Sequence, residues 1–199
     1  MTSGSGLFEM RRMEALSNTI FGVAMTLLAY QVPKDRFATP DPKWADIWLS
    51  YGSHLSALLL SFIVAGMFWY SHQRRLAYSA EGNRIEMIVN LLFLLSIIVL
   101  PVTTGLLGSY IASADVTALY GFNLTLISTL NTILWVIAAA PRRDWVAIVA
   151  PAFATVIFVV GSILSVIEPH LARYVWPLAF VAPVMGSYVE RWESRHTQG

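Results

Sequence analysis

Charged residues divide this chain into long uncharged stretches, and the lengths of these stretches predict its elements. Six of them occur, at 15–33, 47–73, 87–114, 116–141, 145–167 and 174–189. A helix needs roughly 20 largely apolar residues to cross the hydrocarbon core of a bilayer. Five stretches meet this length, and the sixth, with 16 residues, needs its flanks. The pattern predicts an all-α membrane protein with six transmembrane helices.

The sixth stretch is the least regular. It contains Pro177 and Pro183, which break a soluble helix but are tolerated in a membrane helix. Trp176, Tyr188 and Trp192 stand near its ends, where aromatic side chains anchor helices at the membrane interface. We therefore retain it as a transmembrane helix.

Composition agrees with this interpretation and excludes other classes. The 199 residues are 56% hydrophobic and 13% charged, whereas soluble domains carry about a quarter charged residues. Thirteen Lys/Arg nearly balance 12 Asp/Glu, so no strong field favours nucleic acid as a partner. The chain has no cysteine, which removes disulfides and cysteine-ligated metals. We expect no cofactor and no metal site.

The placement of the basic residues predicts the topology, because Lys and Arg accumulate in cytoplasmic connections. With the N-terminus inside, nine basic residues fall on the inner side and four on the outer side. Both termini are therefore expected in the cytoplasm. We divide the chain into a flexible tail (1–10), a single six-helix membrane domain (11–192) and a cytoplasmic tail (193–199).

The first predicted helix carries a stripe of residues at spacings of three and four. The stripe consists of Thr19, Val23, Thr26, Leu27 and Tyr30. Such spacing places all five side chains on one face of a helix. A Thr in a membrane helix usually bonds its own helix backbone or a neighbouring helix, so the hydroxyls alone do not indicate a pore.

Polar residues also gather at the inner end of this helix. Ser17 and Asn18 follow Arg12 closely, and polar groups at this density are costly in a membrane unless they pair or meet water. Trp69 and His72 end the second helix, where they are either interfacial side chains or partners of the first helix. We predict an inner polar network of Arg12, Ser17, Asn18, Trp69 and His72.

Enzyme motifs are missing from the sequence. It contains no nucleophile elbow, paired-histidine zinc motif, phosphate-binding loop or dinucleotide fingerprint. The uncharged stretches also hold no carboxylate, which weakens a proton-coupled carrier. We expect the protein not to be an enzyme.

Four segments together resemble a known family. They are Arg12-Met-Glu-Ala-Leu-Ser-Asn-x-x-Phe-x-x-Ala-Met-Thr-Leu-Leu, Trp69-x-x-His72, Asn90-Leu-Leu-Phe-Leu-Leu and Leu100-Pro-x-Thr-Thr-Gly-Leu-Leu-Gly. In this order they resemble the bacterial members of the endolysosomal potassium channel family, the transmembrane protein 175 family. The resemblance implies a six-helix subunit in a homotetramer, with helix one lining a central pore that has no carbonyl filter.

The resemblance also assigns residues. The family motif Arg-x-x-x-Phe-Ser-Asp is matched at Arg12 and Ser17, while Leu16 and Asn18 replace its Phe and Asp. The family's apolar constriction maps to Val23 and Leu27, with Tyr30 one turn further. Thr19 and Thr26 are then the pore hydroxyls.

The functional hypothesis is a potassium-permeable channel in the bacterial plasma membrane, with K⁺ as the permeant ion and lipid and further copies of the chain as partners. No string of arginines resembles a voltage sensor, so little voltage dependence is expected. Two alternatives stay open: a small oligomeric cation or proton-coupled transporter, and a non-conducting scaffold subunit.

Overall fold

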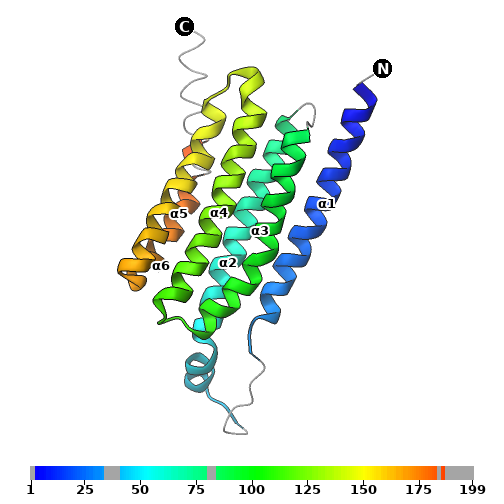
Figure 1. Cartoon of the computed structure of the whole chain (residues 1–199). Helices are drawn as coiled ribbons and strands as arrows, with labels where there is room; N and C mark the ends of the chain where they lie inside the picture. The colour runs from blue at the N-terminus through cyan, green and yellow to red at the C-terminus, as the bar shows by residue number, and fades with distance from the viewer. Residues whose placement is uncertain (1–2, 34–40, 80–83, 183–184, 187–199) are drawn as a thin grey trace.

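A computed structural model describes residues 3–33, 41–79, 84–182 and 185–186, with side chains from residue 11 onward. Its long helices pack side by side into one bundle (Figure 1). They are α1 Ser3–Tyr30, α2 Trp44–Tyr78, α3 Arg84–Ser109, α4 Ala114–Ala139 and α5 Val149–Ile167. The short elements are α6 Pro169–Val175 and three 3₁₀ turns, η1 Ala140–Arg142, η2 Val146–Ile148 and η3 Trp176–Val181. The all-α class is confirmed.

Four helices of the described chain are long and apolar enough to cross a membrane. They comprise α2, α3, α4 with its 3₁₀ extension, and α5 with the turn before it. The longest, α2, has 35 residues, which corresponds to a length of about 50 Å and exceeds the roughly 30 Å hydrocarbon core. The prediction of several membrane-spanning helices is confirmed for these four.

The first predicted span forms a helix but is not one of these four. α1 has 28 residues and begins at Ser3, before residue 11, where we placed the start of the membrane domain. It lies alongside α2 and α3 (Figure 1). Its Ser, Thr and Asn residues and its arginine pair make it more polar than its neighbours.

The sixth predicted span is interrupted in the structure. α6 has only seven residues and passes directly into η3, which has Pro177 in its first turn. Proline supplies no backbone N–H to an α-helical ladder. Residues 183–184 and 187–189 of this predicted span lie outside the described residues.

Hydroxyl and amide side chains join the helices inside the apolar core. The hydroxyl oxygens of Thr104 on α3 and Ser61 on α2 lie 2.7 Å apart, and the Ser61 hydroxyl lies 2.9 Å from the hydroxyl of Tyr120 on α4. Asn123 of α4 donates to Thr103 of α3 at 3.3 Å. Burying such groups is tolerable only when they are paired, so these contacts fix which helix faces meet.

Pro101 stands within α3, which continues through it to Ser109. The carbonyl oxygen that loses its α-helical donor there is that of Ile97, four residues earlier. Thr103 and Thr104 lie just beyond the proline, 3.1 and 2.7 Å from the carbonyl oxygen of Leu100, and these are ordinary hydroxyl contacts to the helix backbone.

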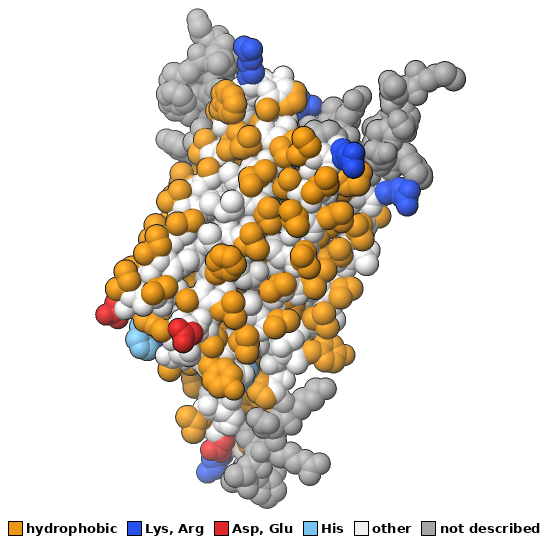
Figure 2. Space-filling model, in the orientation of Figure 1, with side chains coloured by type: hydrophobic (Ala, Val, Ile, Leu, Met, Phe, Trp, Pro, Cys, Tyr) orange, Lys and Arg blue, Asp and Glu red, His pale blue; other side chains and the backbone are white. Residues whose placement is uncertain are grey.

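The surface is organised as the membrane assignment requires. On the face shown in Figure 2, hydrophobic side chains form a broad band, while most Lys and Arg side chains lie towards one end. That end holds the start of α1 and the end of α2 (Figure 1). This arrangement matches a bilayer, because apolar side chains face the hydrocarbon core and charged side chains reach the water at its two surfaces.

Candidate functional site

The two sides of α1 have opposite surroundings. Phe21 and Leu28, each 1% exposed, face the bundle and belong to its core side. Val23, Leu27 and Tyr30 lie on the other side and are 54%, 41% and 67% exposed. The predicted stripe is thus the face of α1 that the single chain leaves uncovered.

The two threonines of the stripe use their hydroxyl protons within α1. Thr19 donates to the carbonyl oxygen of Ala15 at 2.9 Å, and Thr26 donates to that of Gly22 at 2.8 Å. Both side chains are exposed on the outer side of α1. Because a hydroxyl oxygen has two lone pairs, each can donate inward and still accept or coordinate outward.

A polar cluster lies inside the bundle where α1, α2 and α3 meet. Arg75 of α2 forms an ion pair with Glu86 of α3, and the two side chains are 0% and 1% exposed. The same guanidinium lies 3.2 Å from His72 Nδ1 and donates to Asn90 Oδ1 at 3.2 Å. Asn90 in turn donates to the Ser17 hydroxyl on α1, at 3.5 Å. The cluster therefore links all three helices.

A second polar contact lies beside this cluster on the exposed surface. Trp69 Nε1 donates to Asn18 Oδ1 at 3.1 Å, and the Gln73 amide donates to the same oxygen. Asn18 is the residue that replaces the acidic position of the family motif. Its carbonyl oxygen accepts the two bonds that a carboxylate would otherwise accept.

The structure divides the predicted inner network into three parts. Ser17 and His72 belong to the buried cluster, whereas Asn18 and Trp69 form the exposed contact. Arg12 is an exposed residue towards the same end of α1. The predicted residues therefore lie at one end of the bundle, some in the buried cluster and the others on the exposed surface beside it.

Sequence reasoning missed the charged members of the buried cluster. Arg75 looked like a flanking residue beside Arg74, and Glu86 stands one position before the uncharged stretch that begins at Met87. Both side chains are buried, so a buried carboxylate lies directly before an uncharged stretch that itself holds none. One pattern could have revealed them: His72 and Arg75 share a face of α2, as Glu86 and Asn90 share a face of α3.

No group of three or more potential metal-ligating side chains occurs in the part of the chain that the structure describes. The buried groups are instead arranged as pairs and short chains between helices. The fold and these contacts define an integral membrane protein built as a bundle of α-helices, with an uncovered apolar face on α1.

Comparison with known proteins supports one family. Residues 12–101 match the family model described as "Endosomal/lysosomal potassium channel TMEM175". The chain is similar to the TMEM175 family over these residues, and the resemblance inferred from the sequence is confirmed. The matched segment contains α1 from Arg12 onward, α2 and the part of α3 up to Pro101, including the buried cluster.

Individual relatives agree with this assignment. A potassium channel of Streptomyces collinus is 29% identical over 131 residues, which are 64% of this chain and 63% of that relative's length. A crystal structure of a lysosomal potassium-selective channel TMEM175 homolog from Chamaesiphon minutus matches with a TM-score of 0.77 and 25% identity, over 89% of this chain and 98% of the other. The potassium channel MtTMEM175 has the same fold, with a TM-score of 0.58 and 14% identity over 94% of this chain and 93% of the other.

Proposed function

We propose that this protein is the subunit of a potassium-permeable channel of the bacterial plasma membrane. Similarity to the TMEM175 family supports this function, as do the named activities of two relatives. The observation that carries the proposal is the uncovered apolar face of α1. This face combines apolar side chains with two threonine hydroxyls and the phenol of Tyr30. Such a mixture suits a water-filled pore wall better than contact with lipid tails.

The channel would be a homotetramer with α1 of each copy at the central axis. In such an assembly, Val23 and Leu27 form successive apolar rings, and Tyr30 forms a more polar ring beyond them. An apolar constriction opposes ion entry because the ion loses hydration water or the pore dewets. Potassium holds its water less tightly than sodium does, so the constriction favours potassium modestly.

The remaining polar groups would assist permeation. The outward lone pairs of Thr19 and Thr26 replace part of the hydration shell. The buried Arg75 cluster holds α1 against α2 and α3 through Ser17 and Asn90. Little voltage dependence is expected because the charged cluster is an internal pair and not a movable row of arginines.

Potassium flux into proteoliposomes tests this function. Leu27→Ala and Val23→Ala are expected to raise conductance or weaken selectivity, because each widens an apolar ring. Val166→Ala is a matched control, since Val166 is also exposed in the single chain (69%) but lies on α5. Unchanged flux in both α1 variants would refute the pore assignment. Saturable flux that requires a proton gradient would instead indicate a transporter.

A further inference from the structure

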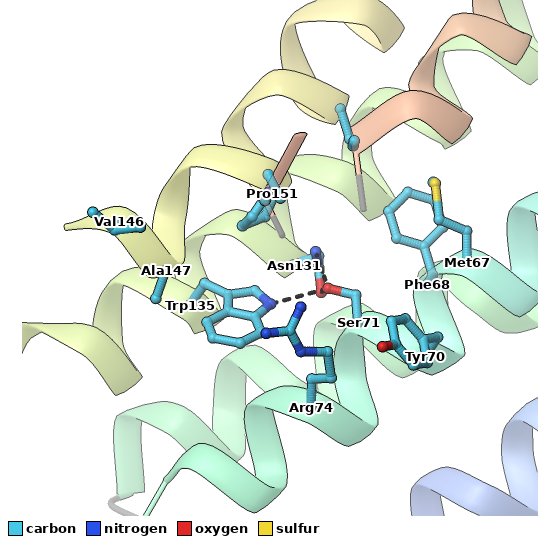
Figure 3. Close-up of a pocket in the computed structure, with 14 residues that line it drawn as sticks. Met67, Phe68, Tyr70, Ser71, Arg74, Asn131, Trp135, Val146, Ala147 and Pro151 are labelled. Carbon is cyan, nitrogen blue, oxygen red and sulfur yellow. Dashed lines mark hydrogen bonds between the residues drawn. The ribbon is translucent and has the colours of Figure 1, made fainter. Parts of the chain in front are cut away.

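A pocket separate from α1 opens between α2, α4 and the start of α5 (Figure 3). Its volume is about 50 Å³, and it is open to the outer surface of the bundle. This volume exceeds the space of a single water molecule and suits a small polar group. The pocket lies at the end of the bundle where α2 and α4 finish and α5 begins (Figure 1).

The charge of the pocket has one sign. Among the fourteen described residues that line it, Arg74 is the one ionisable at neutral pH, and it is positive. Its guanidinium extends from α2 towards Trp135 of α4 (Figure 3). Arginine offers a planar set of N–H donors that matches a phosphate group. The start of α5 borders the same space, and the turn before it is capped by Asp144, whose carboxylate accepts from the Ala147 N–H at 3.2 Å. Arg74 is therefore the group of this lining that an anion would contact.

Uncharged polar side chains fix the wall next to Arg74. Trp135 Nε1 donates to the Ser71 hydroxyl at 2.9 Å, and the Asn131 amide donates to the same oxygen at 3.1 Å. These bonds hold the indole, which is 5% exposed, in place within the pocket wall.

Apolar side chains line the deeper part. Met67 and Phe68 stand about two helical turns before Arg74 on α2, a rise of about 10 Å, and Pro151 and Ala154 face them from α5. The pocket therefore changes from a cationic mouth to an apolar interior in the direction of the membrane centre. An amphiphile with an anionic head has the same order of groups.

We propose that this pocket binds an anionic phospholipid, with Arg74 contacting its phosphate and an acyl chain following the apolar wall. The pocket holds the phosphate, and the remainder of the lipid lies on the outer surface between α2 and α5. This site is independent of the proposed pore, because it lies on the side of α2 that faces α4 and α5.

Native mass spectrometry of the purified, assembled protein tests the site, with phosphatidylglycerol and phosphatidylcholine as probes. We expect preferential retention of phosphatidylglycerol and a loss of about tenfold in its apparent affinity in Arg74→Gln, from the removal of charge-assisted hydrogen bonds. Arg143→Gln is the matched control, because Arg143 is an exposed arginine at the same end but does not line the pocket.

A second variant tests the shape of the pocket without changing its charge. Ala147→Leu adds bulk to the wall and should also reduce retention of phosphatidylglycerol. An equal loss in Arg143→Gln would show diffuse attraction to a basic surface and overturn the proposal. So would equal retention of phosphatidylcholine, or competition by millimolar inorganic phosphate, which would indicate a site for free anions. The readout is lipid retention, so its failure leaves the channel proposal untouched.

Discussion

Arg75 and Glu86 form an ion pair that is closed off from solvent on both sides, with 0% and 1% exposed side chains. Arg75 lies in the last turn of α2 and Glu86 in the first turn of α3, so the pair joins these two helix ends inside the bundle. Two buried charges are tolerable because each has a partner, and Asn90 and His72 add polar contacts to the guanidinium. The pair thus anchors the position where α1 meets the bundle.

Removal of one member of this pair should destabilise the fold strongly. Glu86→Gln leaves the guanidinium of Arg75 buried without its carboxylate, and we expect a loss of about 3–5 kcal/mol in the free energy of unfolding. Arg75→Met should cost a similar amount, because it leaves the carboxylate unpaired. Denaturant unfolding in detergent measures both.

The double variant Arg75→Met/Glu86→Leu provides the control for this prediction. Replacing both charges by apolar side chains removes the unpaired group, so most of the lost stability should return. Additive losses in the double variant would show that the two residues do not act as a pair. Arg143→Gln, at an exposed position, should leave stability unchanged.

Two hydroxyls on opposite sides of α1 should have separable effects. Ser17→Ala leaves the buried Asn90 amide without its acceptor and should cost about 1–3 kcal/mol of stability. Thr19→Val removes an exposed hydroxyl that donates to the backbone of its own helix, so stability should change by less than about 0.5 kcal/mol. If Thr19 faces the pore, this variant should instead lower potassium conductance. Thermal unfolding and single-channel recording distinguish the two effects.

Restoring the acidic residue of the family motif should strengthen the contact at the inner end of α1. In Asn18→Asp, the carboxylate accepts from Trp69 and Gln73 through charge-assisted bonds, which should add about 0.5–1.5 kcal/mol of stability. The added negative charge should also raise cation conductance at low ionic strength and lose this effect at high salt. Asn18→Ala is the control, and a gain in that variant would exclude the electrostatic explanation.

The packing of Trp176 makes Gly161 sensitive to substitution. A Cβ at position 161 would lie 2.4 Å from Trp176 Nε1, and Trp176 is fully buried. Gly161→Ala should therefore cost about 1–3 kcal/mol through overpacking. Gly66→Ala is a matched control with no atom within 4 Å of the new Cβ, and it should be neutral or stabilising. Equal melting temperatures for the two variants would contradict this arrangement.

The sequence predicted only part of the polar cluster. Ser17 and His72 were identified because a polar residue inside an apolar helix is conspicuous and costly. Arg75 was missed because arginines at a helix end are usually interfacial, and only the rotation of α2 turns Arg75 inward while Arg74 lines the pocket. Glu86 was missed for the same reason at the start of α3.

The helix pattern was predicted more completely than its ends. Long uncharged stretches indicated α2 to α5 correctly, because crossing hydrocarbon demands a continuous apolar helix. The change from α6 to η3 depends on Pro177 and on the packing of Trp176 against α4 and α5. The spacing of charged residues carries no information about this packing.

The sequence by itself determined that this chain is an integral membrane protein, that it is helical, and which face of its first helix carries the apolar and hydroxyl stripe. These properties follow from composition and spacing, because each residue contributes to them without reference to distant partners. The tertiary structure decided which charged residues are buried together and where a cationic pocket opens. Such relationships depend on how helices rotate and pack, since a helix presents several faces and only its neighbours determine which one is inside.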